Sequence, residues 1–341
     1  MHRVRSRCSL LILSLSWVRG PARTMAAVLA LALLFAAACD RPEQAPASGR
    51  LSVVTTLFPL YDFVRHVGRD KVDVKLLLPP GVESHGFEPR PEDIVLVNKA
   101  AVFVYTNRFM EPWAAQLVKG VGRERGLVVI DASSGVRFLP LAAKKSGWQA
   151  DDHDHGAHEG QGHQGGADPH IWLSIPNARK MVQNIAAGLA ARDPKNGNWY
   201  VRNAESYLRE LDHLDESFSR GLGNCRTRLF LHGGHSAFGY LADRYGLTYV
   251  SAYPATADAE PTPRKFMEII ALMRKNGIGY IFYEELITPR AAQVIAAETG
   301  ASLLRLHGLH NVGRDDLASG ATYLSLMGRN LENLRTGLQC R

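Results

Sequence analysis

The sequence predicts an α/β fold of two lobes, each built on a parallel β-sheet, with one long rigid helix joining them. Short apolar runs rich in β-branched residues alternate with amphipathic helical segments along most of the chain. Such runs are typical of parallel strands that helices cover on both faces. The alternation occurs twice, and one long helical pattern lies between the two occurrences, which indicates two lobes rather than one continuous sheet.

The first lobe is expected to cover residues 51–195. Strands are predicted at 51–56, 72–78, 101–105 and 127–133, with helical patterns from Pro59 to Val67, over PEDIVLVNKA and over PWAAQLVKG between them, and with the amphipathic helix IPNARKMVQNIAAGLAA at the end. A polar segment, residues 151–165, interrupts this pattern before the last helix and cannot contribute to a core.

A linking helix is predicted over residues 196–222, because it follows the turn DPKNG, stops at Gly221 and carries its large apolar side chains on one stripe. The second lobe, residues 223–341, repeats the alternation. Its predicted strands lie at 228–232, 247–253, 278–284 and 301–307, and its helices at Ser236–Tyr245, Pro263–Lys275, Pro289–Thr299 and, at the C-terminus, near Asp315–Leu338.

Residues 1–39 have the features of an export signal, because arginines precede apolar runs too short to cross a membrane and small residues follow. Met1 and Met25 are both candidates for the translation start. The segment FAAAC, which ends at Cys39, resembles a lipoprotein processing site, so Cys39 is a candidate for lipid attachment; the alternative is ordinary cleavage after an A-x-A pattern. The polar residues 40–50 form a tether. We therefore expect an exported protein, in the periplasm or at the outer face of the cytoplasmic membrane.

The leader carries most of the positive charge. The chain has 40 Lys and Arg against 33 Asp and Glu, and the leader holds five Arg and no acidic residue, so its removal lowers the net charge from +7 to +2. The mature chain therefore has no basic patch of the kind that binds nucleic acid. We expect a monomer that contacts the membrane only through a lipid at Cys39.

Two cysteines, Cys225 and Cys340, remain after the leader is removed. In an exported protein they most simply form one disulfide, which would join the end of the chain to the segment before the strand at 228–232. The alternative is two unpaired buried thiols.

Isolated histidines lie at the ends of predicted strands in both lobes. They are His85, His170, His235, His307 and His310, and all but His170 come soon after a predicted strand. The loops at the carboxyl ends of parallel strands line the ligand crevice of an open sheet. Because neutral imidazole is the commonest metal donor and four nitrogen or oxygen ligands suit tetrahedral Zn²⁺, these positions predict a metal site in the cleft between the lobes.

Several segments resemble, in order, those of the metal-specific class of ABC-transporter solute-binding proteins, the zinc and manganese uptake receptors. They are VVTTLFPLYDFVRHVG, LLLPPGVESHGFEPRPEDI, ADPHIWLS, HSAFGYLADRYGL, AEPTPRKFMEII and IFYEELITPRAAQVIAAETGA. The resemblance covers most of the mature chain. It implies two lobes of βα units, a rigid helix between them and one metal ion held in the cleft.

The resemblance implies that the metal ligands are His85 in GVESHGFEP, His170 in DPHIW and His235 in HSAFGY. The fourth ligand of the family is usually Asp or Glu in the loop after the last strand. Counting back from GATYLSLM, His310 occupies that position here, and His307 is the competing candidate. An all-nitrogen ligand set favours Zn²⁺ over Mn²⁺, which prefers oxygen donors.

Other polar residues near these loops are expected to have structural roles. Asp315 and Asp316 come too late in the loop and are expected to begin the last helix. Glu284 and Glu285 also follow a strand, and we expect them at a helix N-terminus or in hydrogen bonds between the lobes.

The polar segment at 151–165 carries four further histidines, His153, His155, His158 and His163. Its high content of Gly and Asp predicts disorder, so metal ligands there would have to be ordered on binding and would be weaker than those of the cleft. We interpret it as an accessory loop that collects zinc; the alternative is an inert polar insertion.

The sequence therefore predicts a receptor that captures Zn²⁺ as a transported ligand and delivers it to the membrane permease of an ABC transporter. Mn²⁺ or Ni²⁺ are alternative cargoes of the same class. A zinc hydrolase is a rival interpretation, but four protein ligands leave no open position for water, and the motifs H-E-x-x-H, G-x-S-x-G and the P-loop are absent. A metal-independent adhesin is the remaining alternative, and it gives no reason for histidines at strand ends in both lobes.

Overall fold

The computed structural model describes residues 49–341 except 121–125, 142–165, 254–261 and 287, and Gly49–Arg341 form one compact unit. Several predictions lie outside the described residues: the export signal, lipid attachment at Cys39, almost all of the tether, and the polar segment with His153, His155, His158 and His163.

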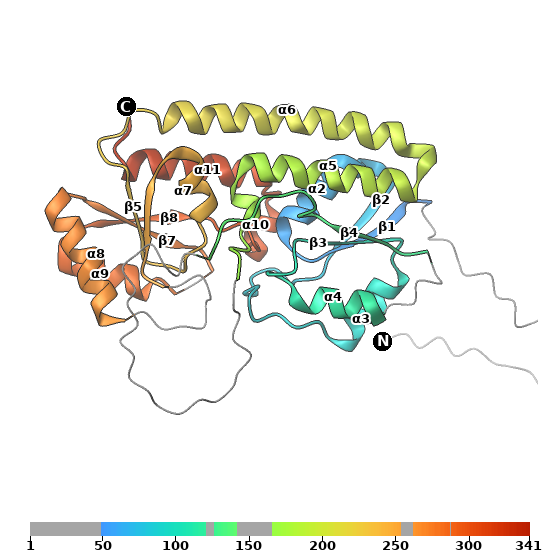
Figure 1. Ribbon diagram of the computed structural model, residues 1–341, viewed down its shortest axis with the longest axis horizontal. Helices are drawn as coiled ribbons and strands as arrows, with labels where there is room; N and C mark the ends of the chain where they lie inside the picture. Colours follow the sequence, from blue (N-terminus) through green and yellow to red (C-terminus); the bar gives the residue numbers. More distant parts are fainter. Residues whose placement is uncertain (1–48, 121–125, 142–165, 254–261, 287) are drawn as a thin grey trace, which may run out of the picture. The chain divides into compact units, whose positions relative to one another are not determined.

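Two four-stranded parallel sheets form the framework of this unit, as the sequence predicts (Figure 1). The first sheet contains β1 (Leu51–Thr55), β2 (Val72–Leu76), β3 (Val102–Tyr105) and β4 (Val128–Asp131), in the order β2-β1-β3-β4. The second contains β5 (Leu229–His232), β6 (Thr248–Ser251), β7 (Tyr280–Glu284) and β8 (Ser302–Leu306), in the order β6-β5-β7-β8. The two lobes therefore share one topology, although their sequences show no repeat.

Helices cover both faces of each sheet. They are α2 (Phe58–Gly68), α3 (Pro91–Lys99), α4 (Pro112–Gly120), α5 (Ile175–Arg192), α6 (Gly197–Gly221), α7 (Gly239–Tyr245), α8 (Pro263–Asn276), α9 (Arg290–Thr299), α10 (Arg314–Ala318) and α11 (Tyr323–Gly337), with short 3₁₀ turns at Arg69–Lys71, Ile171–Leu173 and Pro194–Asn196.

Alternate strand residues enter different cores, which explains the continuous apolar runs. In β1, Val53 packs into the large core that contains α2, α5 and α6, while Val54 packs against α3 and α4 on the other face. In β5, Phe230 joins the large core and Leu231 packs against α8 and α9. A strand buried on both faces needs apolar residues at every position, so it shows no polar alternation.

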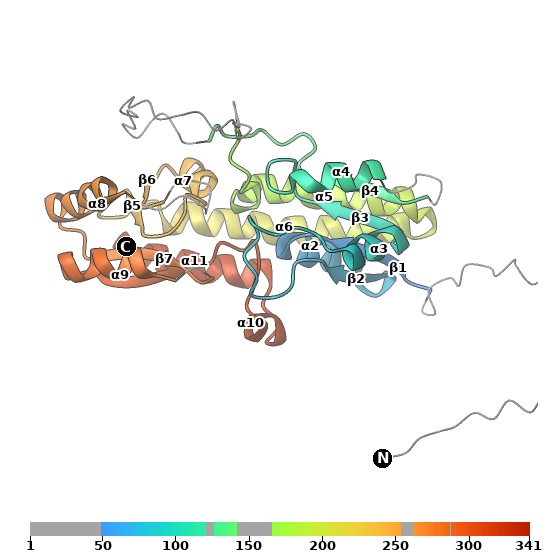
Figure 2. The same cartoon turned by 90° about the horizontal axis from the view of Figure 1, so that it is seen from below.

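The long helix α6 contacts elements of both lobes. It buries Tyr200, Tyr207, Leu211 and Phe218 on one face, packs against α2 and α5 of the first lobe and against α11 of the second, and lies along them in Figures 1 and 2. The Tyr207 hydroxyl donates to Oδ2 of the buried Asp62 at 3.2 Å, and the Tyr323 amide donates to the same oxygen at 3.0 Å. One carboxylate thus joins α2, α6 and α11.

The predicted C-terminal helix is two helices, which corrects the expectation of one helix near Asp315–Leu338. The chain leaves α10 through Gly320, whose φ of 76° lies in the left-handed region that ends helices. It re-enters a helix at α11, where Thr322 and Ser325 form a capping box. Asp315 and Asp316 lie in the first turn of α10, as expected for residues that begin a helix.

A disulfide joins Cys225 and Cys340, which are 115 residues apart, and the two residues also form an isolated antiparallel bridge. The bond therefore connects the segment before β5 to the end of α11. In the part of the chain that the structure describes, no helix combines the length and the apolar character needed to cross a bilayer.

Candidate metal centre

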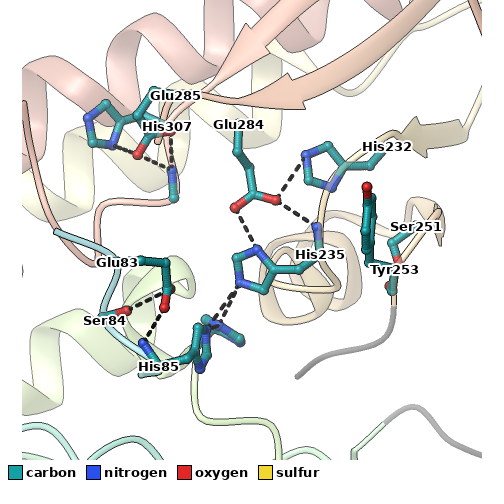
Figure 3. A network of polar contacts seen from close by, with 12 residues as sticks. Glu83, Ser84, His85, His232, His235, Ser251, Tyr253, Glu284, Glu285 and His307 are labelled. Atoms are coloured by element: carbon teal, nitrogen blue, oxygen red, sulfur yellow. Dashed lines mark hydrogen bonds and ion pairs between the residues drawn. The ribbon is translucent and has the colours of Figure 1, made fainter. Parts of the chain in front are cut away.

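Three histidines from distant parts of the sequence place their ring nitrogens together. The Nε2 atoms of His85 and His235 are 3.4 Å apart, those of His85 and His170 are 3.2 Å apart, and those of His170 and His235 are 3.1 Å apart. Figure 3 shows the rings of His85 and His235 directed at one another. Within the described ranges, these three residues are the one group of His, Cys, Asp or Glu whose geometry could hold a metal ion.

The parallel topology explains why these residues meet. His85 lies in the loop between β2 and α3, His235 lies between β5 and α7, and His170 comes directly before the 3₁₀ turn Ile171–Leu173. The first two loops follow the carboxyl ends of strands, where open parallel sheets bind ligands. The site therefore takes residues from both lobes.

Two glycines allow the chain to reach His235. A Cβ atom on Gly234 would lie 2.1 Å from Oε1 of Glu284, and one on Gly233 would lie 2.5 Å from the Cβ of Ala292. At both positions a Cβ atom would clash with buried atoms whose displacement would be energetically costly, so the loop after β5 requires glycine here. This requirement explains the sequence GGH at the end of the strand.

Carboxylates fix the orientation of two of the three rings. Nδ1 of His170 lies 2.8 Å from Oδ1 of Asp168, and Nδ1 of His235 lies 2.6 Å from Oε2 of Glu284 (Figure 3). The same carboxylates also accept the backbone amides of these histidines, at 3.0 Å and 2.8 Å. Because an ionised carboxylate only accepts hydrogen bonds, these contacts favour a proton on Nδ1 of each ring, which leaves the Nε2 lone pair directed at the cluster.

His310 lies beside this cluster. Its ring centroid is 5.9 Å from that of His235 and 6.3 Å from that of His85. The residue is 1% exposed, and neither of its ring nitrogens has a hydrogen-bond partner among the residues that the structure describes. Such atoms are costly to bury, so an unpartnered imidazole next to three others requires an explanation.

His307 has a different environment. Its Nδ1 lies 3.0 Å from Oε1 of Glu285 and 2.9 Å from the amide nitrogen of Leu309, and Figure 3 shows its ring beside Glu285. Its backbone amide and carbonyl are both bonded to the side chain of Asn330, at 2.7 Å and 2.8 Å. The ring and backbone of His307 therefore support the loop after β8.

Burial keeps the rings of His85 and His310 neutral. Burial, with the neighbouring His170 and His235, lowers the pKa of His85 to about 2. Burial and the same group of histidines hold the pKa of His310 well below its usual range. His235 differs, because burial acts to lower its pKa but the carboxylates of Glu284, Glu83 and Asp168 together outweigh this effect, and the net pKa is raised.

The orienting carboxylates are the functional residues that the sequence does not identify. Asp168 stands two residues before His170 in ADPHIW, and this spacing is the signal that could have identified it. Glu284 is the last residue of β7, whereas α9 begins only at Arg290, so Glu284 is not at a helix N-terminus as expected. Glu284 bonds His235, and Glu285 accepts the amide of Gly308 at 3.1 Å; both contacts lie within the second lobe, not between the lobes.

A family model and two known proteins with similar sequences have descriptions that refer to zinc. Residues 53–337 match the model of a family described as zinc-uptake complex component A, periplasmic. The zinc-binding lipoprotein AdcA of Streptococcus pneumoniae strain R6 is 34% identical over 305 residues, which cover 89% of this chain and 59% of AdcA. The chain thus spans only part of that relative. The high-affinity zinc uptake system protein ZnuA of Bacillus subtilis is 33% identical over 315 residues, which cover 91% of this chain and 96% of ZnuA.

A solved structure has the same fold. The crystal structure of the Zn(II)-bound ZnuA-like domain of Streptococcus pneumoniae AdcA superposes with a TM-score of 0.70 at 30% sequence identity, over 85% of this chain and 99% of that domain. The two-lobed architecture of parallel sheets is therefore common to both proteins.

Proposed function

The chain belongs to the zinc-uptake complex component A family, and from this membership and the geometry of the cluster we propose that it captures Zn²⁺ outside the cytoplasm and delivers it to the permease of an ABC transporter. The ion is cargo, so the protein binds and releases it without changing it. His85, His170, His235 and His310 are the proposed ligands.

The observation that carries this proposal is the convergence of three Nε2 atoms, at separations of 3.1 to 3.4 Å. A tetrahedral site with Zn–N bonds of about 2.0–2.1 Å has N–N edges of about 3.3–3.4 Å. Asp168 and Glu284 hold the protons of their rings at Nδ1, so the lone pairs of His170 and His235 point at one another. These lone pairs repel unless a proton or a metal cation lies between them.

His310 is the better candidate for the fourth ligand. Both of its nitrogens are buried and without partners, so coordination would satisfy one of them. Nε2 of His307 is also buried without a partner, but Nδ1 of His307 contacts Glu285 and the loop backbone, whereas the His310 ring lies 5.9 Å from that of His235 in the cluster. We therefore propose His310 as the ligand and His307 as a support for the loop.

Four imidazole nitrogens suit Zn²⁺ better than Mn²⁺, because Mn²⁺ prefers oxygen donors. A closed shell of four protein ligands also leaves no position for a reactive water, and the Glu284 carboxylate lies against Nδ1 of His235 on the side away from the cluster. We therefore propose a binding protein without enzymatic activity.

The remaining proposals rest on the sequence. We propose lobes at 51–195 and 223–341 with the linking helix at 196–222, a monomeric receptor, lipid attachment at Cys39 after removal of the export signal, and an accessory zinc-collecting role for His153, His155, His158 and His163.

Zinc titration of the purified protein against a competing chelator tests the proposal. We expect one tight site that survives deletion of residues 151–165, a loss of at least about 100-fold in affinity for His310→Ala, and weaker binding of Mn²⁺. His307→Ala is the comparison variant, because His307 supports the same loop without binding the metal, and it should weaken zinc binding less than His310→Ala does. Loss of the tight site with the deletion, together with normal binding by His310→Ala, would contradict the cleft assignment.

A further inference from the structure

The loop that carries His310 is anchored on the opposite lobe. This loop follows β8 of the second sheet, yet the Phe58 amide of α2 donates to the His310 carbonyl at 3.3 Å. The indole nitrogen of Trp172 donates to the Gly308 carbonyl at 2.8 Å. Two elements of the first lobe therefore contact the loop within two residues of the proposed fourth ligand.

Asn311, the residue after His310, uses all of its polar side-chain atoms in such contacts. Its Nδ2 donates to the carbonyls of Pro79 at 2.7 Å and Val82 at 2.8 Å, while its Oδ1 accepts the Val312 amide at 2.8 Å. The side chain is 0% exposed, and both of its amide hydrogens and its oxygen are used. Only an amide supplies two donors and one acceptor in this arrangement, because a carboxylate would face two carbonyl oxygens.

The segment that Asn311 holds leads directly to His85. The Glu83 carboxylate, next in the chain after Val82, accepts the backbone amides of His85 at 2.8 Å and Gly86 at 3.3 Å, and Figure 3 shows the first of these contacts. The chain from Val82 to His85 is thus fixed locally. One side chain therefore connects the loop of His85 in the first lobe to the loop of His310 in the second.

The His310 loop also contains a backbone conformation that must be held in place. Leu309 has a φ of 60°, in the left-handed region, which is unfavourable for a residue with a Cβ atom. On the other side of Asn311, the Gly81 amide donates to the Val312 carbonyl at 2.9 Å. Contacts on both sides of the strained residue keep the loop from relaxing away from the cluster.

We propose that Asn311 is a positioning residue for the metal site, which sets the separation of the His85 and His310 rings and thereby maintains tight, four-coordinate binding of Zn²⁺. This inference rests on the proposed zinc site. Metal ligands must be held within about 0.5 Å of their productive geometry, and Asn311, like Trp172, is a side chain that bridges ligand loops from different lobes.

The test compares Asn311→Ala with Asn184→Ala in the complete protein. Asn184 is a matched control, because its Nδ2 also donates to two backbone carbonyls, those of Ala132 at 2.9 Å and Ser134 at 2.8 Å, but it joins no ligand loop. Zinc affinity is measured by chelator competition. The coordination geometry is measured from the visible absorption of the Co²⁺-loaded protein, which is strong for a tetrahedral site and weak when water enters the coordination shell.

We expect Asn311→Ala to lower zinc affinity by about 10–100-fold and to weaken the Co²⁺ absorption, while Asn184→Ala changes neither. Asn311→Ser keeps one donor and should give intermediate values; it takes the place of Asn311→Ala if that variant does not fold. Wild-type affinity in the Asn311 variants, an unchanged Co²⁺ spectrum in them, or an equal loss in Asn184→Ala would each overturn the inference. Absence of tight zinc binding by the unsubstituted protein would instead overturn the proposed function, and the inference with it.

Discussion

At the scale of single residues, metal binding depends more on the orientation of each imidazole than on its presence. A histidine binds a metal through one nitrogen, and the partner of the other nitrogen decides which one is free. Glu284 contacts His235 through Nδ1 and through the backbone amide, so it fixes both the ring and the chain beneath it. It also raises the pKa of His235 and so increases competition between protons and metal at this ring.

This dual role predicts a specific pH profile for Glu284→Gln. In the metal-free protein His235 is protonated below its raised pKa, and zinc must displace that proton, so affinity is constant above the pKa and falls by about tenfold per pH unit below it. His85, with a pKa of about 2, stays neutral throughout and does not contribute. Removal of the charge on Glu284 lowers the pKa of His235, so the fall should begin at a lower pH than in the unsubstituted protein.

Glu284→Gln should also weaken zinc binding at pH 8 by about 10–100-fold, because the ring is less firmly oriented. Chelator competition at several pH values between 5 and 8.5 measures both effects. Glu285→Gln is the control, since Glu285 contacts His307 and Gly308 rather than His235, and its pH profile should match that of the unsubstituted protein. A Glu284→Gln profile that begins to fall at the same or a higher pH would show that another group controls the proton competition.

The sequence identifies the candidate ligands but not their partners. His85, His235 and His310 follow strands, and this position alone predicts that they lie at the carboxyl ends of the strands in each sheet. Asp168 and Glu284 could not be assigned in the same way, because a carboxylate near a histidine in sequence or after a strand has many possible partners. The contact of Glu284 with His235 depends on how the ends of β7 and β5 approach in space, which no local pattern specifies, whereas Asp168 stands only two residues before His170.

At the scale of elements, local patterns predict the strands closely and the helix ends less well. Every predicted strand occurs within a few residues of its expected bounds, because a run buried on both faces has few alternatives in an α/β protein. The error at the C-terminus has a local cause. Gly320 and the cap at Thr322 divide a pattern that remains amphipathic throughout, so apolar periodicity alone continues across the break.

The long helix α6 illustrates how one element is tied to both lobes. Tyr207→Phe removes the hydroxyl that donates to the buried Asp62, whose carboxylate also accepts the Tyr323 amide. We expect the free energy of unfolding to fall by about 1–3 kcal/mol, as for other lost hydrogen bonds to a buried carboxylate. Urea denaturation measures this loss.

Zinc affinity provides the internal control for Tyr207→Phe. The hydroxyl contacts Asp62 and not a ligand loop, so the folded variant should bind zinc within about twofold of the unsubstituted protein. Unchanged stability would show that the bond contributes nothing, and a large loss of affinity would show that α6 controls the site directly.

At the scale of the whole unit Gly49–Arg341, a proposed metal ligand and the disulfide lie at opposite ends of the strands of the second sheet. His235 follows the carboxyl end of β5, whereas Cys225 precedes its amino end and pairs with Cys340. Backbone hydrogen bonds accompany the disulfide, from Arg226 to Gln339 at 3.2 Å and from Arg341 to Asn224 at 2.9 Å. The chain terminus is therefore held at this edge by non-covalent contacts as well.

This separation predicts that the Cys225→Ser, Cys340→Ser double variant loses stability but keeps its zinc site. The disulfide closes a loop of 115 residues. In the chain-entropy model, a loop of that size lowers the entropy of the unfolded chain and so raises the free energy of unfolding by about 4–5 kcal/mol. We expect the double variant to have a lower urea midpoint, and the decrease should be similar in the metal-free and the zinc-loaded protein. Zinc affinity should stay within about twofold, because the backbone pairing preserves the native edge and the ligand loops lie at the other end of the strands.

Equal stability with and without the disulfide would contradict the first expectation. A selective loss of zinc affinity would show instead that the two edges of the sheet are coupled.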